Sequence, residues 1–210
     1  MTPMTSTSAT RPIDHLLAVD PASADVLFRQ ARTANTFTDE PVTDEQVEAI
    51  HELMKWGPTA FNCQPLRMLF VRSAEARERL VSHMSTGNKA KTSTAPLVAV
   101  LCVDSRFHEV LPTVFPVSPT LKDSYADEQK RLDVATPQAW LQAGYVIMGI
   151  RALGLAAGPM LGFNRATLDA DLLADTGWRS IAVVNIGRPG PDAWRDRLPR
   201  LDLTEVSRTV

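Results

Sequence analysis

Residues 55–70, K-W-G-P-T-A-F-N-C-Q-P-L-R-M-L-F, lead from a helix through a polar turn into an apolar strand. Gly57 and Pro58 predict the helix end, because proline disfavours helix at the preceding residue and glycine adopts the left-handed conformation common at helix C-termini. The turn is a candidate ligand site, although such side chains can also serve only their own backbone. Its hydrogen-bonding side chains are Thr59, Asn62 and Gln64.

Apolar runs near residues 66–72, 97–103 and 180–187 predict strands, and most of the remaining chain has helical spacing. Strands and helices do not alternate regularly, so we expect an α+β fold with a mixed, mostly antiparallel sheet flanked by helices. The length of 210 residues fits one domain, here residues 21–210, preceded by a disordered tail over residues 1–20.

Capping signals place the helices. Thr43 and Gln46 form a capping-box pattern, Ser23 can cap a helix running to about Arg32, and Thr136 can cap a helix with Pro137 in its first turn. Ser73 and Asn164 each predict a further helix start. The stretch S-T-G-N-K-A-K-T, residues 85–92, is predicted to be a turn.

Two long segments lack a regular pattern. Residues 105–136 contain Pro112, Pro116 and Pro119, and a connection this long indicates a lid over a ligand. Residues 188–210 form a proline-broken basic tail that we expect to be extended.

Composition excludes several classes of function. Lys plus Arg total 22 against 24 Asp plus Glu, so a nucleic-acid or anionic-membrane footprint is absent from the totals. Cys63, Cys102 and the four histidines lack metal-ligand spacing, which predicts no metal. No run approaches the ~18 apolar residues of a membrane span, and a signal peptide is not evident, so we expect a soluble cytoplasmic protein.

Five motifs in order resemble the FMN-dependent nitroreductase family, over about residues 24–206, and most closely its malonic semialdehyde reductase branch. They are A-R-T-A-N-T-F (31–37), W-G-P-T-A-F-N-C-Q-P (56–65), G-N-K-A-K-T (87–92), R-A-L-G-L-A-A-G-P-M-L-G-F (151–163) and R-L-P-R-L (197–201). The resemblance implies an intertwined homodimer with FMN at the interface.

The resemblance also implies a role for each motif. The phosphate grip would be Arg32, Thr33 and Arg197, with Asn35 beside it and Arg195 as a weaker candidate. The segment reaching the flavin from the partner subunit would be Pro58, Thr59, Ala60, Asn62 and Gln64. The ribityl chain and pyrimidine edge would face Asn88 and Lys91, and N5 would face Pro159, Met160, Leu161 and Gly162.

The sequence departs from the family pattern at two positions. Ala31 stands where many members have a first phosphate-binding arginine, and Leu161 stands where a well-known subgroup has glutamate. How the phosphate is held, and which acceptors are preferred, are therefore open.

The implied activity is ping-pong hydride transfer from NADH or NADPH through flavin N5 to a small electrophile: a semialdehyde such as malonic semialdehyde, a quinone, a nitroaromatic or an enone. Lys91 would stabilise negative charge on the reduced flavin, so no catalytic side chain is required. Two alternatives are a thiol enzyme using Cys63 and a flavin-binding or flavin-consuming protein without NAD(P)H reductase turnover.

Two segments predict the homodimer independently. The turn 57–65 offers polar groups with no evident partner nearby, and the tail 194–206 alternates Trp194, Leu198, Leu201 and Leu203 with basic groups beyond the last strand. Both segments make sense if they reach across a two-fold axis.

Overall fold

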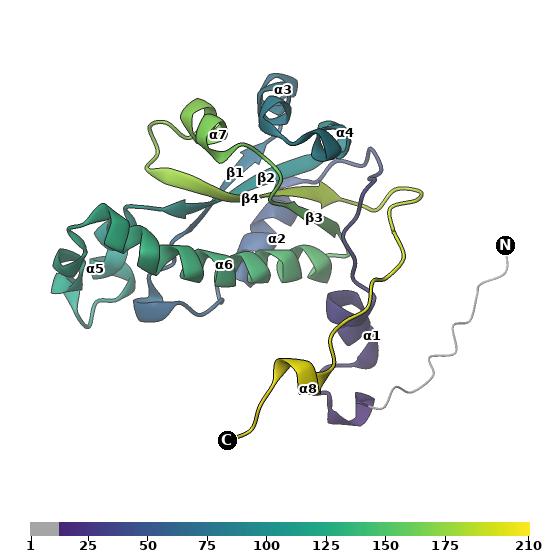
Figure 1. Ribbon diagram of the computed structural model, residues 1–210, viewed down its shortest axis with the longest axis horizontal. Helices are drawn as coiled ribbons and strands as arrows, with labels where there is room; N and C mark the ends of the chain where they lie inside the picture. Colours follow the sequence, from purple (N-terminus) through teal and green to yellow (C-terminus); the bar gives the residue numbers. More distant parts are fainter. Residues whose placement is uncertain (1–12) are drawn as a thin grey trace.

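The computed structural model of this protein describes residues 13–210, built around a four-stranded sheet in the order β1-β2-β4-β3 (Figure 1). The strands are β1 (Leu66–Val71), β2 (Leu97–Asp104), β3 (Ala156–Met160) and β4 (Trp178–Gly187). The α+β prediction is confirmed, but all pairings among the described strands are antiparallel rather than mixed. Edge strand β3 was not predicted, because its short A-A-G-P-M run resembles a turn and Pro159 is tolerated only at an edge.

Helices cover both faces of the sheet (Figure 1). The longer ones are α2 (Asp44–Met54), α3 (Ala74–His83), α4 (Thr86–Thr94), α6 (Glu128–Ala152) and α7 (Arg165–Leu172). The shorter helical segments are η1 (Asp14–Leu16), α1 (Pro21–Ala24), the π-helix η2 (Asp25–Arg29), η3 (Ala60–Asn62), η4 (Phe107–Val110), α5 (Leu111–Val114), η5 (Pro119–Tyr125) and α8 (Leu203–Val206).

Strand β2 separates two hydrophobic cores. Leu97, Ala99, Leu101 and Val103 face a core shared with α2 and α6, whereas Val98, Val100 and Cys102 face a core shared with α3 and α7. All eight residues of β2 are buried, as the continuous apolar run predicts.

Three helix predictions are confirmed and two helix starts were wrong. The Thr43 capping box and the Ser73 and Asn164 caps are present. Asp20, not Ser23, caps the first helix, since its carboxylate accepts the Ser23 N–H at 2.9 Å, and that helical segment ends at Arg29. A carboxylate placed just before Pro21 is the better cap.

Helix α6 begins at Glu128 and is capped by Asp127, whose carboxylate accepts the Lys130 N–H at 2.7 Å; Thr136 does not cap it, and the helix continues through Pro137. The buried stripe of Ala135, Ala139, Ala143, Val146 and Ile150 packs against the sheet on both sides of this proline. Tertiary packing therefore outweighs the lost hydrogen bond.

Residues 86–94 form helix α4, so the predicted turn at 85–92 was wrong. The lid expected over residues 105–136 contains short helices that bury Phe107 and Leu111, together with the first part of α6. Of the tail expected over residues 1–20, residues 1–12 lie outside the described residues, and η1 lies in the rest.

The C-terminal tail runs beside the segment that follows η2 (Figure 1). Phe37 and Pro189 form a β-bridge, and the Asn35 N–H donates to the Ala193 carbonyl at 3.0 Å. The tail therefore contacts its own chain before it leaves the body of the protein, and only α8 within it is helical.

The hydrogen bond from the Leu66 N–H to the Gln142 Oε1, 3.0 Å long and buried, joins α6 to the start of β1. We expect Gln142→Leu to lower the free energy of unfolding by ~1–3 kcal/mol, because a buried donor is left unpaired. Denaturant unfolding at fixed protein concentration measures the loss. Gln129→Leu, exposed on the same helix, is the control, and equal stabilities of the two variants would contradict this role.

Candidate functional site

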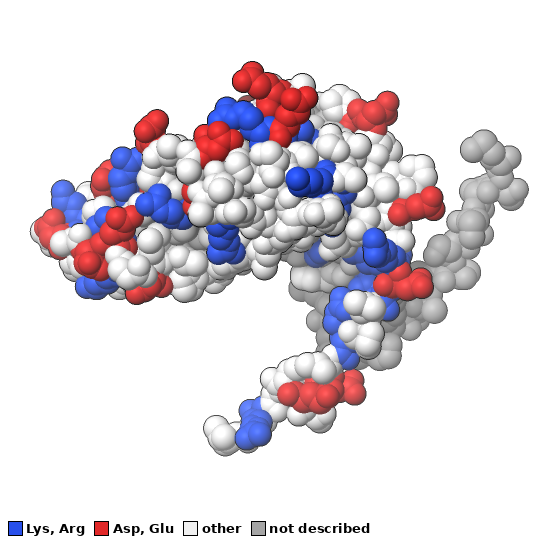
Figure 2. Space-filling view, turned by 45° about the horizontal axis from the view of Figure 1, so that its top comes forward, with Lys and Arg blue, Asp and Glu red and all other residues white. Residues whose placement is uncertain are grey.

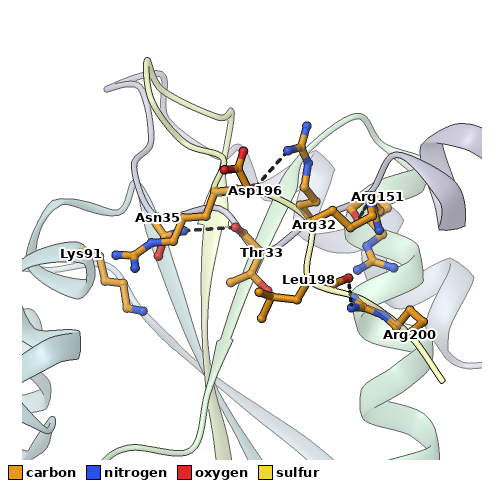
Figure 3. A pocket seen from close by; sticks show the side chains of 11 residues that line it. Arg32, Thr33, Asn35, Lys91, Arg151, Asp196, Leu198 and Arg200 are labelled. Carbon is orange, nitrogen blue, oxygen red and sulfur yellow. Dashed lines mark hydrogen bonds between the residues drawn. The ribbon is translucent and has the colours of Figure 1, made fainter.

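A basic cavity of about 460 Å³ lies between the segment after η2, the C-terminal tail and the ends of α4 and α6 (Figure 3). Six of its lining side chains are cationic and one is acidic. The lining residues are Ala31, Arg32, Thr33, Asn35, Lys91, Arg151, Arg195, Asp196, Arg197, Leu198 and Arg200. Lys and Arg side chains also gather on the surface where the tail leaves the body (Figure 2). Such a cavity favours an anionic ligand.

Backbone carbonyls hold the two walls of the basic cavity together. Arg32 Nη1 donates to the Arg195 carbonyl at 3.0 Å, and Arg197 Nη2 donates to the Ala31 carbonyl at 3.1 Å. Arg32 also lies over the Trp194 ring, 5.7 Å from its centroid. Each guanidinium has further N–H groups beyond those bonded to a carbonyl, so both can bind an anion.

Lys91 lies at the opposite end of the cavity from Arg151 and Arg200 (Figure 3). Burial lowers the pKa of the Lys91 ammonium, and the charge of Arg195 lowers this pKa further. The fully buried Asn185 fixes the backbone here by donating to the Lys91 carbonyl at 3.0 Å. A partly desolvated cation held in this way is suited to contact with a developing negative charge.

Helix α4 connects the basic cavity to the strip 159–162. Asn88, three residues before Lys91, donates from Nδ2 to the Gly162 carbonyl at 3.0 Å. A Cβ at Gly162 would lie 2.6 Å from that Nδ2, so a larger residue there would displace the Asn88 amide. Pro159 and Leu161 are exposed, whereas Met160 is buried. Asn88 therefore positions the strip, and the exposed residues can face a ligand.

The turn 57–65 lies elsewhere, and none of its residues lines the basic cavity of its own chain. Ala60 N–H donates to Gln138 Oε1 at 3.0 Å, and Asn62 Nδ2 donates to the Val114 carbonyl at 2.9 Å. The expectation that the turn has no partner nearby was therefore wrong. Thr59 and Gln64 are bonded within the turn itself, since Thr59 Oγ1 accepts the Gln64 N–H. Pro58, the remaining predicted residue of the turn, is exposed.

The backbone of this turn is strained. Phe61, Asn62 and Gln64 have φ angles of 54°, 50° and 41°, in the left-handed region that bulky residues rarely adopt. Phe61 stays 48% exposed and packs edge-on against Phe115, with centroids 5.5 Å apart. Strain of this kind concentrates at functional sites.

Cys63 is placed poorly for nucleophilic chemistry. It is 1% exposed, and burial raises the pKa of its thiol, whereas a nucleophile requires a lowered thiol pKa. The geometry disfavours the thiol-enzyme alternative.

An exposed apolar patch lies on α2 and α6 beside the turn. We call it the helix patch and define it by Leu53, Trp56, Trp140, Leu141 and Tyr145, of which Trp56 is 76% exposed. Tyr145 packs against Gly57, where an added Cβ would lie 3.0 Å from the ring. Exposed aromatic and leucine side chains on neighbouring helices are typical of an interaction surface.

Two arginines that line the cavity, Arg151 and Arg200, were not predicted. Six lining residues were predicted: Arg32, Thr33, Asn35, Lys91, Arg195 and Arg197. Arg151 was detectable as the single charged residue in the apolar run 138–153, and Arg200 is the second arginine of the R-L-P-R-L motif, in which only Arg197 was given a role. Among residues 13–210, no cluster of three or more potential metal ligands occurs, and no helix is both long and apolar enough to cross a membrane.

Comparison with known proteins agrees with this architecture. The family model described as "Nitroreductase family" matches residues 28–188. A protein from Streptomyces griseus named "Putative NADH dehydrogenase/NAD(P)H nitroreductase" is 57% identical over 92% of this chain and 99% of its own. A similarly named Streptomyces coelicolor protein is 58% identical over the same shares.

A solved nitroreductase structure in complex with FMN, from Exiguobacterium sibiricum, superposes with a TM-score of 0.79 at 17% identity, covering 92% of this chain and 98% of that one. This likeness shows the shared fold, while the family model and the Streptomyces proteins show the shared ancestry. The chain therefore belongs to the nitroreductase family.

Proposed function

We propose that this protein is an FMN-dependent oxidoreductase that takes hydride from NADH or NADPH and delivers it to a small electrophile. The basic cavity carries the proposal, because its cations have almost no acidic partner and suit a phosphate group. The relatives named NAD(P)H nitroreductase and the FMN complex of the same fold support it.

The residues present fit FMN. Arg32, Thr33 and Arg197 would hold the phosphate, Asn35 and Arg195 would lie beside it, and Lys91 would contact the pyrimidine edge. Gly162 lies close to the Asn88 and Ser85 side chains, and the exposed Pro159 and Leu161 of the strip 159–162 would face the ring system. FMN, when bound, supplies a site at N5 that accepts and donates hydride.

The chain's own task is to bind, orient and stabilise charge. Lys91, with its lowered pKa, would gain a favourable interaction when the ring system becomes anionic. The proposed electron acceptors are a semialdehyde, a quinone and a nitroaromatic. The semialdehyde follows from the resemblance to the malonic semialdehyde reductases. The names of the relatives favour the nitroaromatic.

Anaerobic addition of NADH or NADPH to the purified protein tests the reaction. We expect the visible flavin absorbance to bleach and to return when a nitroaromatic, quinone or semialdehyde is added. A flavin that neither nucleotide bleaches would identify a flavin-binding protein without this turnover.

Arg197→Ala tests the phosphate site. We expect it to weaken FMN binding by about 2 kcal/mol, roughly 30-fold, because hydrogen bonds to charged groups contribute ~1.5–3 kcal/mol. Fluorescence of released flavin on dilution measures the affinity. Arg188→Ala is the control, since Arg188 pairs with Glu40 outside the cavity; an unchanged affinity in Arg197→Ala would remove this residue from the site.

We further propose that the active form is a homodimer in which the turn 57–65 of each subunit reaches the partner's flavin. The helix patch beside the strained turn supports this arrangement, as do the exposed leucines 198, 201 and 203 of a tail that extends away from the body (Figure 1). Burial of these side chains by a second copy would remove a large apolar surface from water.

Trp56→Glu tests the dimer, because a charge at the most exposed side chain of the helix patch opposes its burial. We expect this variant to sediment as a monomer and to lose bound FMN. Val117→Glu is the control, with an equally apolar side chain that is 81% exposed outside the patch. A monomer with full FMN content and turnover would contradict the proposal.

A further inference from the structure

Arg151 is a partly buried cation without an acidic partner. It lies in the last turn of α6, where Nη1 donates to the Leu27 carbonyl at 3.0 Å and contacts Met148 Sδ at 3.8 Å. Burial lowers the pKa of its guanidinium, and the charge of Arg197 lowers this pKa further. No ion pair with Arg151 occurs among residues 13–210.

Two other partly buried arginines are paired with carboxylates of the chain. Arg29 pairs with two carboxylates, those of Asp14 and Asp25, and Arg67 pairs with Asp104 at 2.8 Å. Arg77 has no carboxylate but donates to three backbone carbonyls, although its buried Nε has no hydrogen-bond partner. Only one carbonyl accepts from the five N–H donors of Arg151. Burying a cation with so few partners costs free energy unless an anion pairs with it.

The position of Arg151 indicates where that anion would lie. Arg151 lines the basic cavity with Arg32 and Arg197, and Ala31 lines the same wall. Arg151 and Ala31 also share the adjoining apolar hollow beneath Trp194. The short side chain of Ala31 supplies no cation to this part of the cavity, whereas the Arg151 guanidinium from α6 does.

We propose that Arg151 is a phosphate-binding residue that completes the phosphate site with Arg32 and Arg197, supplying from α6 the guanidinium that Ala31 lacks. This inference rests on the proposed function, since the phosphate is that of FMN. It assigns Arg151 to binding, whereas the bond to Leu27 alone would make it only a support for the π-helix η2. The two roles differ in one measurable respect: only a phosphate ligand distinguishes FMN from riboflavin, which lacks the phosphate.

The test is displacement of bound FMN from the purified holoprotein by riboflavin. The riboflavin-to-FMN ratio at half displacement measures the preference for the phosphate. In Arg151→Met, which removes the charge and keeps much of the side-chain length, we expect this preference to fall at least 10-fold. Arg151→Lys should retain part of the preference, because the charge remains but the bidentate geometry does not.

A second substitution makes the test specific. Ala31→Arg in the Arg151→Met background should restore the preference, because both positions line the same wall. Arg179→Met, at an arginine paired with Glu128 outside the cavity, should leave the preference unchanged. If Arg151→Met weakens FMN and riboflavin equally, or changes neither, the proposal is overturned. A wild-type protein that binds no flavin would instead overturn the proposed function.

Discussion

The burial of strands β2 and β4 on both faces is the constraint on which the rest of the structure depends. Their side chains alternate between a core against α2 and α6 and a core against α3 and α7, and each buried Val, Leu or Ile contributes roughly 1.5–3 kcal/mol. Neither face tolerates water, so helices must cover both. The polar segments cannot enter these cores, so they lie at the borders of the sheet and helix layers. The basic cavity and the strained turn 57–65 are both in such segments.

The basic cavity gathers like charges from four parts of the chain. These parts are the segment after η2, the end of α4, the end of α6 and the tail. Backbone hydrogen bonds between residues 35–38 and 188–193 form one wall of the cavity, and the end of α6 forms another. Burial lowers the pKa values of Lys91 and Arg151, and repulsion from the neighbouring cations Arg195 and Arg197 lowers them further. A bound anion would offset both the burial of these cations and their mutual repulsion. Ligand binding should therefore stabilise this region.

The structure brings six of the residues predicted for the site into one cavity, whereas the other predicted residues do not line it. Arg32, Thr33, Asn35, Lys91, Arg195 and Arg197 do meet in one cavity. Arg151 was missed because it lies in a helix whose apolar pattern indicates core, and a pattern cannot show that its last turn opens into a cavity. Asn88, which was predicted to lie beside a ligand, donates to the Gly162 carbonyl, a contact that only the folded chain creates.

The sequence by itself determined the local elements, because caps, breakers and apolar periodicity act over a few residues: the Thr43 capping box, the Ser73 and Asn164 caps and the three longer strands follow from it. Tertiary structure decided the rest. It extended α6 through Pro137, since the buried alanine stripe outweighs one lost hydrogen bond, and it made an edge strand of A-A-G-P-M by offering β4 as a partner. It also brought Arg151 to Ala31, which are 120 positions apart, because packing against the sheet, and not local preference, sets where the end of α6 lies.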